Sequence, residues 1–412
     1  MDNVRQLLPI WNEKERRRRI LLACRISVLL IFILCTVVLV RHFLVRRFSG
    51  YEVLAETGLY HSLSGCSVEG DVLLAYSNDG AKAVSKRGEL LWEMSYRMEN
   101  PKLAGCGEVA AVADIGGTSV YIMDKDRVTY HDEVVYPIVK HEVAGQGVTA
   151  VLLDNGSEDY IQLYDKNGTL RVDINTITKK DGIPVDIALS SDGKKLVTLY
   201  MTYEGNAMLC KVTFYHAGET GRNYISNIVG QKIYEENRLV FDVGFLEDDI
   251  LYVLLENGFA LYRMSEVPQL ICEKTLAGSY VDMALAEDGL YIITEDTSKQ
   301  RMMTFYNSKG DAAKTWKTVP EYESVMATED EVIFFSPRSV TIYRSNRSLK
   351  FHKVFEQSLE GIFPAGDNRY FLVDTSKVQA IKLSGKANDK EDKSSAHMSG
   401  RAFSFGKQGG LE

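Results

Sequence analysis

The stretch NDGAKAVSKRGELLWEMS, residues 78–95, contains the smallest structural unit that recurs along this chain of 412 residues. Two short segments rich in apolar residues flank the turn at residues 86–89, and the second segment carries Trp92. Asn-Asp-Gly and Lys-Arg-Gly are turn sequences, because glycine accepts the positive φ that a tight hairpin requires. Short strands joined by such turns predict an antiparallel β-structure.

The same pattern recurs with a period of about 40 residues, which is the size of a four-stranded propeller blade. A turn precedes a strongly apolar strand, and a second turn leads into a strand that carries a tyrosine in most units. Seven complete units occupy residues 71–95, 108–134, 147–174, 194–225, 249–275, 288–319 and 330–355.

An eighth unit, residues 360–384, supplies three strands and then ends. A fourth strand is available in YEVLAE, residues 51–56, near the other end of the domain. A ring closed by pairing these two segments leaves no free sheet edge, whereas an open solenoid exposes one. We therefore predict an all-β fold, a closed β-propeller of about eight four-stranded blades. Seven blades is the alternative count.

The N-terminal 47 residues have a different composition from the rest. They hold ten Lys and Arg against three acidic residues, and because the whole chain carries −8, the remainder carries −15. Between Ile20 and Val40 the sequence is apolar except for Arg25. At about 1.5 Å per residue this stretch spans about 30 Å, the thickness of the bilayer hydrocarbon. Arg25 lies one turn inside the edge, where its side chain can extend to the headgroups.

Seven basic residues up to Arg25, against three directly after the apolar stretch, predict that the N-terminus stays in the cytoplasm. The segment RHFLVRRF that follows offers no small-residue cleavage site, so we predict a retained signal-anchor. The expected organisation is a basic cytoplasmic segment (1–19), one transmembrane helix (20–45), a linker (46–50), the propeller (51–384) and a disordered tail (385–412). The acidic body argues against nucleic-acid binding, which needs a cationic surface.

Gly88 and Trp92 have the spacing of the quinoprotein-type repeat, in which the tryptophan packs between blades. The other positions that mark this repeat fall on Lys82, Val84 and Arg87, which do not match. We therefore interpret Trp92 as an inter-blade packing residue whose N–H reaches a carbonyl, and we predict no cofactor.

Cys66 and Cys106 end the similar phrases SLSGC and KLAGC, 40 residues apart. A disulfide between adjacent blades is one interpretation, and two small residues on crowded inner strands is the favoured one.

The histidines lack zinc spacing, and the acidic runs at 247–249 and 329–331 are expected to be solvated turns. We nominate no catalytic, cofactor-binding or metal-binding residue.

The chain resembles a bacterial family of unknown function, typical of Firmicutes. The resemblance rests on the apolar span and on the blade phrases LLAYSNDGAKAVSKRGELLW and LYDKNGTLRVDI. It implies a short basic cytoplasmic end, one membrane span and an extracytoplasmic WD40-like or quinoprotein-like propeller. It implies no catalytic residues, because no activity is established for that family.

These observations predict a single-pass membrane protein whose extracytoplasmic propeller is a non-catalytic binding or assembly module. The expected partner is a protein or glycan of the cell envelope. The alternatives are a quinoprotein-like oxidoreductase, a propeller hydrolase or lyase, and a sensor. The segment YMTYEGNAML, 200–209, is the expected binding loop, because tyrosine and methionine are enriched at interfaces. Its candidate residues are Tyr200, Met201, Tyr203 and Met208.

Overall fold

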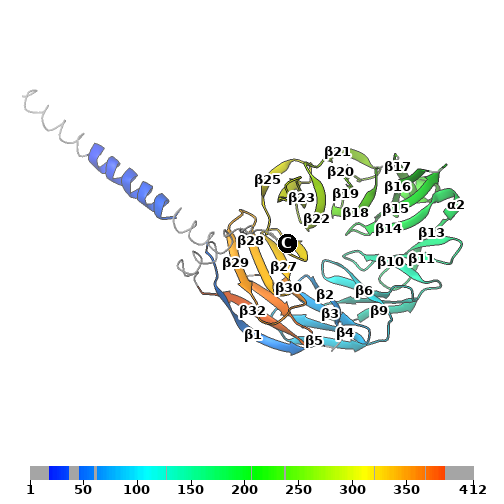
Figure 1. Cartoon of the computed structure of the whole chain (residues 1–412), viewed down its shortest axis with the longest axis horizontal. Coiled ribbons are helices and arrows are strands. Elements are labelled where there is room, and N and C mark those ends of the chain that lie inside the picture. Colours follow the sequence, from blue (N-terminus) through cyan, green and yellow to red (C-terminus); the bar gives the residue numbers. More distant parts are fainter. Residues whose placement is uncertain are drawn as a thin grey trace, which may run out of the picture.

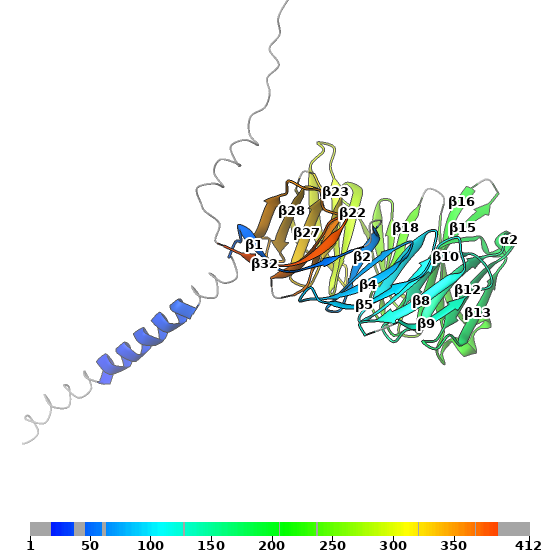
Figure 2. The same ribbon diagram turned by 90° about the horizontal axis from the view of Figure 1, so that it is seen from below.

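The computed structural model describes residues 18–36, 46–59, 63–126, 128–205, 207–235, 238–319, 321–366 and 368–385. Within these ranges the chain forms one long helix, Arg18–Thr36, and 32 strands in eight four-stranded sheets. The sheets follow one another in chain order around a ring, as Figure 1 shows. Figure 2 shows the same ring after a 90° turn, with the helix outside it. The predicted eight-bladed propeller is confirmed. The predicted disordered tail lies outside the described residues, apart from Gly385.

The first four blades each contain four consecutive strands. Blade 1 consists of β2 (Leu63–Glu69), β3 (Val72–Ser77), β4 (Gly80–Ser85) and β5 (Leu90–Ser95). Blade 2 consists of β6 (Pro101–Cys106), β7 (Val109–Asp114), β8 (Ser119–Asp124) and β9 (Val128–Glu133). Blade 3 consists of β10 (Ile138–Val143), β11 (Thr149–Asp154), β12 (Asp159–Tyr164) and β13 (Leu170–Thr176). Blade 4 consists of β14 (Ile183–Leu189), β15 (Lys195–Glu204), β16 (Ala207–His216) and β17 (Ile228–Tyr234).

The next three blades repeat this order, and the last blade takes its fourth strand from the N-terminal end of the propeller. Blade 5 consists of β18 (Val240–Glu247), β19 (Ile250–Leu255), β20 (Gly258–Arg263) and β21 (Gln269–Thr275). Blade 6 consists of β22 (Ser279–Ala286), β23 (Gly289–Glu295), β24 (Arg301–Asn307) and β25 (Ala312–Lys317). Blade 7 consists of β26 (Ser324–Ala327), β27 (Glu331–Ser336), β28 (Ser339–Arg344) and β29 (Leu349–Val354). Blade 8 consists of β30 (Gly361–Pro364), β31 (Arg369–Val373), β32 (Lys377–Ser384) and β1 (Gly50–Gly58). Short helical turns, α2 (Thr178–Asp181), η1 (Gly221–Asn223) and η2 (Ile225–Asn227), belong to connections before and within blade 4.

Each pair of adjacent blades encloses its own buried apolar cluster, and eight such clusters follow the ring. The cluster between blades 1 and 2, for example, joins Leu74 of β3 to Val112 of β7. All six residues of β3 are buried, because both faces of the sheet are packed against neighbouring blades. This explains why the second strand of a blade has an unbroken apolar run rather than an alternating pattern.

The ring is closed by β1, which pairs antiparallel with β32 from Gly50 opposite Ser384 to Gly58 opposite Lys377. This is the pairing that the incomplete eighth unit predicted. The turn in the opening stretch touches the closing strand, because a Cβ added at Gly88 would lie 2.6 Å from the Cβ of Ala55. Gly88 also has φ of +83°, so both its backbone and its surroundings require glycine.

Trp92 packs between blades as predicted. Its indole N–H donates to the carbonyls of Asp124 and Lys125 in blade 2, both at 3.2 Å. The opening stretch therefore contacts blade 8 through its turn and blade 2 through its tryptophan. It acts as the corner of a blade.

The segment predicted as a linker is part of the propeller. Phe48 is only 9% exposed and packs in the cluster between blades 7 and 8. Its N–H donates to the carbonyl of Lys350 (2.9 Å), and it forms a parallel bridge with Phe351. The guanidinium of Arg344 binds the carbonyl of Arg46. The chain is therefore fixed to the ring before the closing strand begins.

The two faces of the ring differ in which turns they carry. The entry face holds the start of β1 at Gly50 and the turns that join the first two strands of each blade, such as 190–194 and 248–249. The far face holds the starts of the first strands and the turns between second and third strands, such as the tip of the β15–β16 hairpin.

Truncation of Phe48 tests whether the segment before β1 stabilises the ring. We expect Phe48→Ala to lower the free energy of unfolding by about 3 kcal/mol, because it removes a buried ring from a packed cluster. Leu54→Ala, on the exposed side of β1, is the matched control and should cost less than about 1 kcal/mol. Denaturant unfolding of the full chain in detergent micelles, followed by tryptophan fluorescence, measures both. Equal costs would contradict an integral role for Phe48.

Candidate binding sites on the two faces

Four neighbouring blades share an irregularity at the far-face end of their first strand. The register of β10, β14, β18 and β22 against the next strand shifts at Val139, Val185, Phe241 and Val281. Such bulges bend a strand and turn a side chain away from the regular alternation. Val139, Val185 and Phe241 are exposed, and Phe241 packs on Tyr280 with ring centroids 6.0 Å apart.

The residue after each bulge is charged. These residues are Lys140, Asp186, Asp242 and Asp282, one on each of the four first strands. Lys140 pairs with Asp186 of the next blade. The repeated Val-Asp or Phe-Asp at 185–186, 241–242 and 281–282 is visible in the sequence. It was missed because each pair alone looks like ordinary strand sequence.

Two carboxyl groups near Lys140 are partly buried, and this burial raises their pKa values. Burial raises the pKa of Glu142 to about 7 although Lys140 lies 3.5 Å away and opposes the shift. Burial also raises the pKa of Asp242 to about 6, against a hydrogen bond of 2.8 Å from the Tyr252 hydroxyl. The negative charge of Asp186 contributes to the rise at Asp242. These carboxyl groups change charge near neutral pH.

A cavity of about 430 Å³ connects these groups to the entry face. We call it the channel cavity. Glycine at position 244 leaves room for the Tyr252 side chain, since an added Cβ would lie 2.4 Å from its hydroxyl. Among the described residues no group of three His, Cys, Asp or Glu is arranged to hold a metal ion. The polar residues that line the channel cavity include Cys106, Lys140, Glu142, Asp242, Glu247 and Tyr252.

A second cavity, of about 660 Å³, lies where blades 7, 8 and 1 meet. We call it the closure cavity. Glu331 on its wall pairs with the buried Lys350 and accepts a hydrogen bond from Tyr370. The acidic run 329–331 was expected to be a solvated turn, and this is wrong for Glu331, because its carboxylate joins blades 7 and 8.

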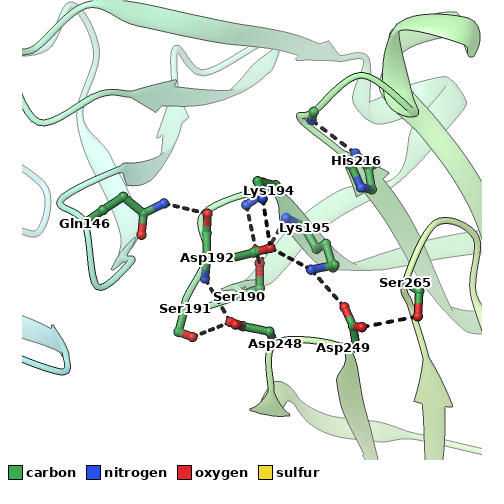
Figure 3. Close-up of polar contacts among 11 residues, drawn as sticks. Gln146, Ser190, Ser191, Asp192, Lys194, Lys195, His216, Asp248, Asp249 and Ser265 are labelled. Atoms are coloured by element: carbon green, nitrogen blue, oxygen red, sulfur yellow. Dashed lines mark hydrogen bonds and ion pairs between the residues drawn. The ribbon is translucent and has the colours of Figure 1, made fainter.

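The acidic run 247–249 was also expected to be a solvated turn, and Glu247 and Asp248 are exposed beside a turn as predicted. Figure 3 shows that Asp248 in addition accepts a hydrogen bond from the Asp192 N–H (2.9 Å) in blade 4. The buried ammonium of Lys195 lies 2.9 Å from Asp192 and 3.0 Å from Asp249. Gln146 of blade 3 donates to the Asp192 carbonyl (2.5 Å). These turns therefore tie three blades together on the entry face.

The predicted binding loop at 200–209 is an extended hairpin, because β15 and β16 pair as far as Glu204 and Ala207. Tyr200 is only 1% exposed and its hydroxyl lies 2.7 Å from that of Tyr215, so it contributes to the core and not to the surface. Tyr203 is 66% exposed and sits directly across from Met208. Met201 and Met208 are half-buried. Tyr203 is therefore the candidate that can reach a partner best.

Other apolar side chains are exposed at the same end of blades 3 to 5. Val135 and Ile177 lie in the connections that lead into β10 and β14, and Ile183 begins β14. The sequence gives little warning of this surface, because the same residue types fill the core. We call the following set the far-face apolar surface: Val135, Val139, Ile177, Ile183, Val185, Tyr203 and Phe241.

Cys66 and Cys106 lie on neighbouring first strands but three residues out of register. Cys106 pairs with Val109 at the hairpin end of β6, whereas Cys66 pairs with Ala75 three residues before the hairpin end of β2. Glu69 occupies the place that matches Cys106. Both thiols are free, and burial raises the pKa of Cys66 to about 12 and also raises that of Cys106.

The ring of eight four-stranded blades defines the chain as an eight-bladed β-propeller. Residues 44–383 match a family described as a family of unknown function, DUF5711, and the chain belongs to this family. The resemblance noted from the sequence is confirmed at this level. No curated protein matches the chain.

Several solved structures share the fold. The WD40 domain of SCAP from fission yeast is 10% identical with a TM-score of 0.52, covering 81% of this chain and 98% of that one. Apo AztD from Citrobacter koseri is 13% identical with a TM-score of 0.50, covering 81% and 93%. BamB from Moraxella catarrhalis is 12% identical with a TM-score of 0.48, covering 81% and 100%. At these identities the likeness concerns the fold alone.

The raised pKa of Glu142 predicts how the stability of the folded chain depends on pH. In the folded state this carboxyl keeps its proton to about pH 7, whereas its ordinary pKa is 4.5. Folded chains therefore bind more protons than unfolded ones between these values, and stability falls as pH rises through that window. We expect Glu142→Gln to raise the unfolding temperature by a few degrees at pH 8 and to change it little at pH 4.5.

The control for this prediction is Glu89→Gln, which removes a negative charge from an exposed turn. Thermal unfolding at both pH values, monitored by circular dichroism, compares the two variants with the parent chain. If Glu142→Gln is less stable than the parent at pH 8, the ion pair with Lys140 outweighs the cost of burial and our assignment is wrong.

Proposed function

We propose that the protein is a membrane-anchored, extracytoplasmic binding module of the cell envelope that holds a protein partner on the far face of its propeller. The observation that carries this proposal is the far-face apolar surface. Exposed apolar side chains gathered at one end of three adjacent blades are typical of protein interaction sites. Phe241 (48% exposed) and Tyr203 are of the residue types that dominate interface energetics.

The anchor supports this choice of face. Helix Arg18–Thr36 is long and apolar enough to cross a membrane, and the chain joins the ring on the entry face through Phe48 and Gly50. If the helix spans the bilayer, the short tether keeps the entry face towards the membrane. The far face then points outward, where an envelope protein can approach it without crossing the lipid surface. An apolar surface favours a protein over a glycan, which is bound mainly through polar groups.

Membrane orientation is tested with a cysteine at Tyr203. We expect Tyr203→Cys to react with a membrane-impermeant maleimide in intact cells, because its side chain projects from the far face. Asn3→Cys, near the basic N-terminus, should react only after lysis. Each is compared with the parent chain, whose native cysteines set the background. If Asn3→Cys reacts in intact cells and Tyr203→Cys reacts only after lysis, the propeller lies in the cytoplasm and the proposed envelope location is wrong.

Partner binding is tested by photo-crosslinking at three exposed positions in living cells. p-Benzoylphenylalanine at Tyr203 or Phe241 should give the same cross-linked protein band. The probe at Ile225, which is 91% exposed on the entry face, should not. Tyr203→Ser combined with Phe241→Ser should then lower recovery of that protein about tenfold, a loss typical of interface hot spots. Ile225→Ser is the matched control. A band formed from Ile225 but from neither far-face position would contradict the proposal.

A further inference from the structure

The connection between β16 and β17, residues 217–227, presents apolar side chains on the entry face. We call this connection the entry-face loop. Ile225 is 91% exposed, which is the highest value for any large apolar side chain in the described part of the chain, and Tyr224 beside it is 43% exposed. A single exposed apolar residue is common on protein surfaces. Its meaning depends on how the loop holds it and on what lies opposite.

The entry-face loop is held firmly against the end of β16. The Tyr224 N–H donates to the Gly221 carbonyl (2.9 Å) and the Asn227 N–H to the Tyr224 carbonyl (3.3 Å). The side-chain amide of Asn227 donates to the carbonyl of His216 (3.1 Å). A Cβ added at Gly221 would lie 1.6 Å from that carbonyl oxygen, so the loop packs closely on the strand. This frame holds Ile225 away from the ring.

The backbone directly after Ile225 is strained. Ser226 has φ of +55° and Asn227 has φ of +60°, and both values lie in the left-handed region that residues with a Cβ rarely adopt. Two such residues in succession cost free energy, and strain of this kind is concentrated at functional segments. The chain therefore accepts strain in the same turn that exposes its isoleucine.

The entry-face loop lies on the face where the chain from the N-terminal helix joins the ring, through Phe48 and Gly50. Strand β1 belongs to blade 8 and the loop to blade 4, so the two lie across the ring from each other (Figure 1). A tether at blade 8 alone leaves the ring free to tilt on the membrane. A second contact at blade 4 would hold the entry face along it.

We propose that the entry-face loop inserts Ile225 into the surface of the bilayer that the N-terminal helix crosses, with the Tyr224 ring at the level of the lipid headgroups. Tyrosine is enriched at this level because its ring is apolar and its hydroxyl is polar. The tether supplies a high effective concentration, so a contact this small is sufficient once the helix is in the bilayer. The inference rests on the membrane-anchored part of the proposed function and adds a second point of membrane contact to it.

The charges around the loop indicate that insertion depends on the apolar side chain and not on attraction to anionic lipids. Within the loop, Glu219 balances Arg222. In the entry-face turns of blades 3 to 5 (144–148, 165–169, 190–194, 217–227, 248–249 and 264–268) acidic residues outnumber basic ones. The acidic residues are Asp165, Asp192, Glu219, Asp248, Asp249 and Glu266, and the basic residues are Lys166, Lys194 and Arg222.

The test uses the full chain in phosphatidylcholine vesicles in which part of the lipid carries bromine near the top of its acyl chains. Bromine quenches tryptophan emission only at close approach, and the parent chain gives the background from its three native tryptophans. We expect the indole introduced by Tyr224→Trp to be quenched. The indole introduced by Tyr203→Trp, on the far face, should keep its emission.

A second substitution in the Tyr224→Trp chain tests the role of the isoleucine. Ile225→Ser should lower the ratio of inserted to free loops about tenfold, because the apolar side chain supplies the transfer free energy. Ile233→Ser is the matched control, since Ile233 is also exposed but lies on the outer strand β17 of the same blade, and it should leave the quenching unchanged. Unfolding temperatures equal to that of the parent show that each variant is folded.

Flotation of the vesicles on a density gradient separates failure of this inference from failure of the proposed function. A chain that does not float has no membrane anchor, and both are then wrong. A chain that floats while Tyr224→Trp stays unquenched, or is quenched no more than Tyr203→Trp, keeps its anchor but lacks the loop contact. Anionic phosphatidylglycerol should not strengthen the quenching. Quenching that requires this lipid and is insensitive to Ile225→Ser would assign the contact to Arg222 and overturn the insertion.

Discussion

The pairing of β1 with β32 is the contact on which the ring depends. Seven blades are built from consecutive strands and could form hairpin by hairpin, but blade 8 is complete only when the two ends of the domain meet. Without that pairing, β32 would expose a free edge and the cluster between blades 7 and 8 would lose Phe48 and Tyr51. Closure of a sheet ring removes such edges, so stability that is otherwise local to neighbouring blades becomes a property of the whole ring.

The sequence predicted the fold well because the repeat is carried by local signals. Turn glycines and apolar second strands can be recognised one blade at a time, and counting them exposes the missing strand that YEVLAE supplies. Gly88 and Trp92 were also assigned correctly, since their spacing implies a blade corner. The linker at 46–50 was not recognised as structural, because a single phenylalanine among basic residues carries no periodic signal.

The candidate sites were harder to predict because they depend on how blades are placed beside one another. Tyr200 and Tyr203 look equivalent in the sequence, but strand alternation sends one into the core and the other into solvent. Lys140, Asp186 and Asp242 are separated by about 50 residues at each step and meet only because the ring brings their strands together. For Cys66 and Cys106 the error was the reverse. Their similar sequence phrases suggested equivalent positions in adjacent blades, but the two residues lie at different distances from the hairpins that follow them.

The two faces of the ring place different physical constraints on a ligand. On the entry face, acidic turns are largely used to fasten one blade to the next, as Asp248 and Asp249 show. The channel cavity beneath them keeps carboxyl groups that burial makes costly to ionise. A cation entering this cavity would offset that cost, which apolar surface cannot do. On the far face the bulges expose apolar side chains instead, so hydrophobic burial is the available driving force there. The ring therefore carries partly buried charged groups towards one face and exposed apolar side chains at the other, and the segment that leads from the N-terminal helix joins it on the charged side.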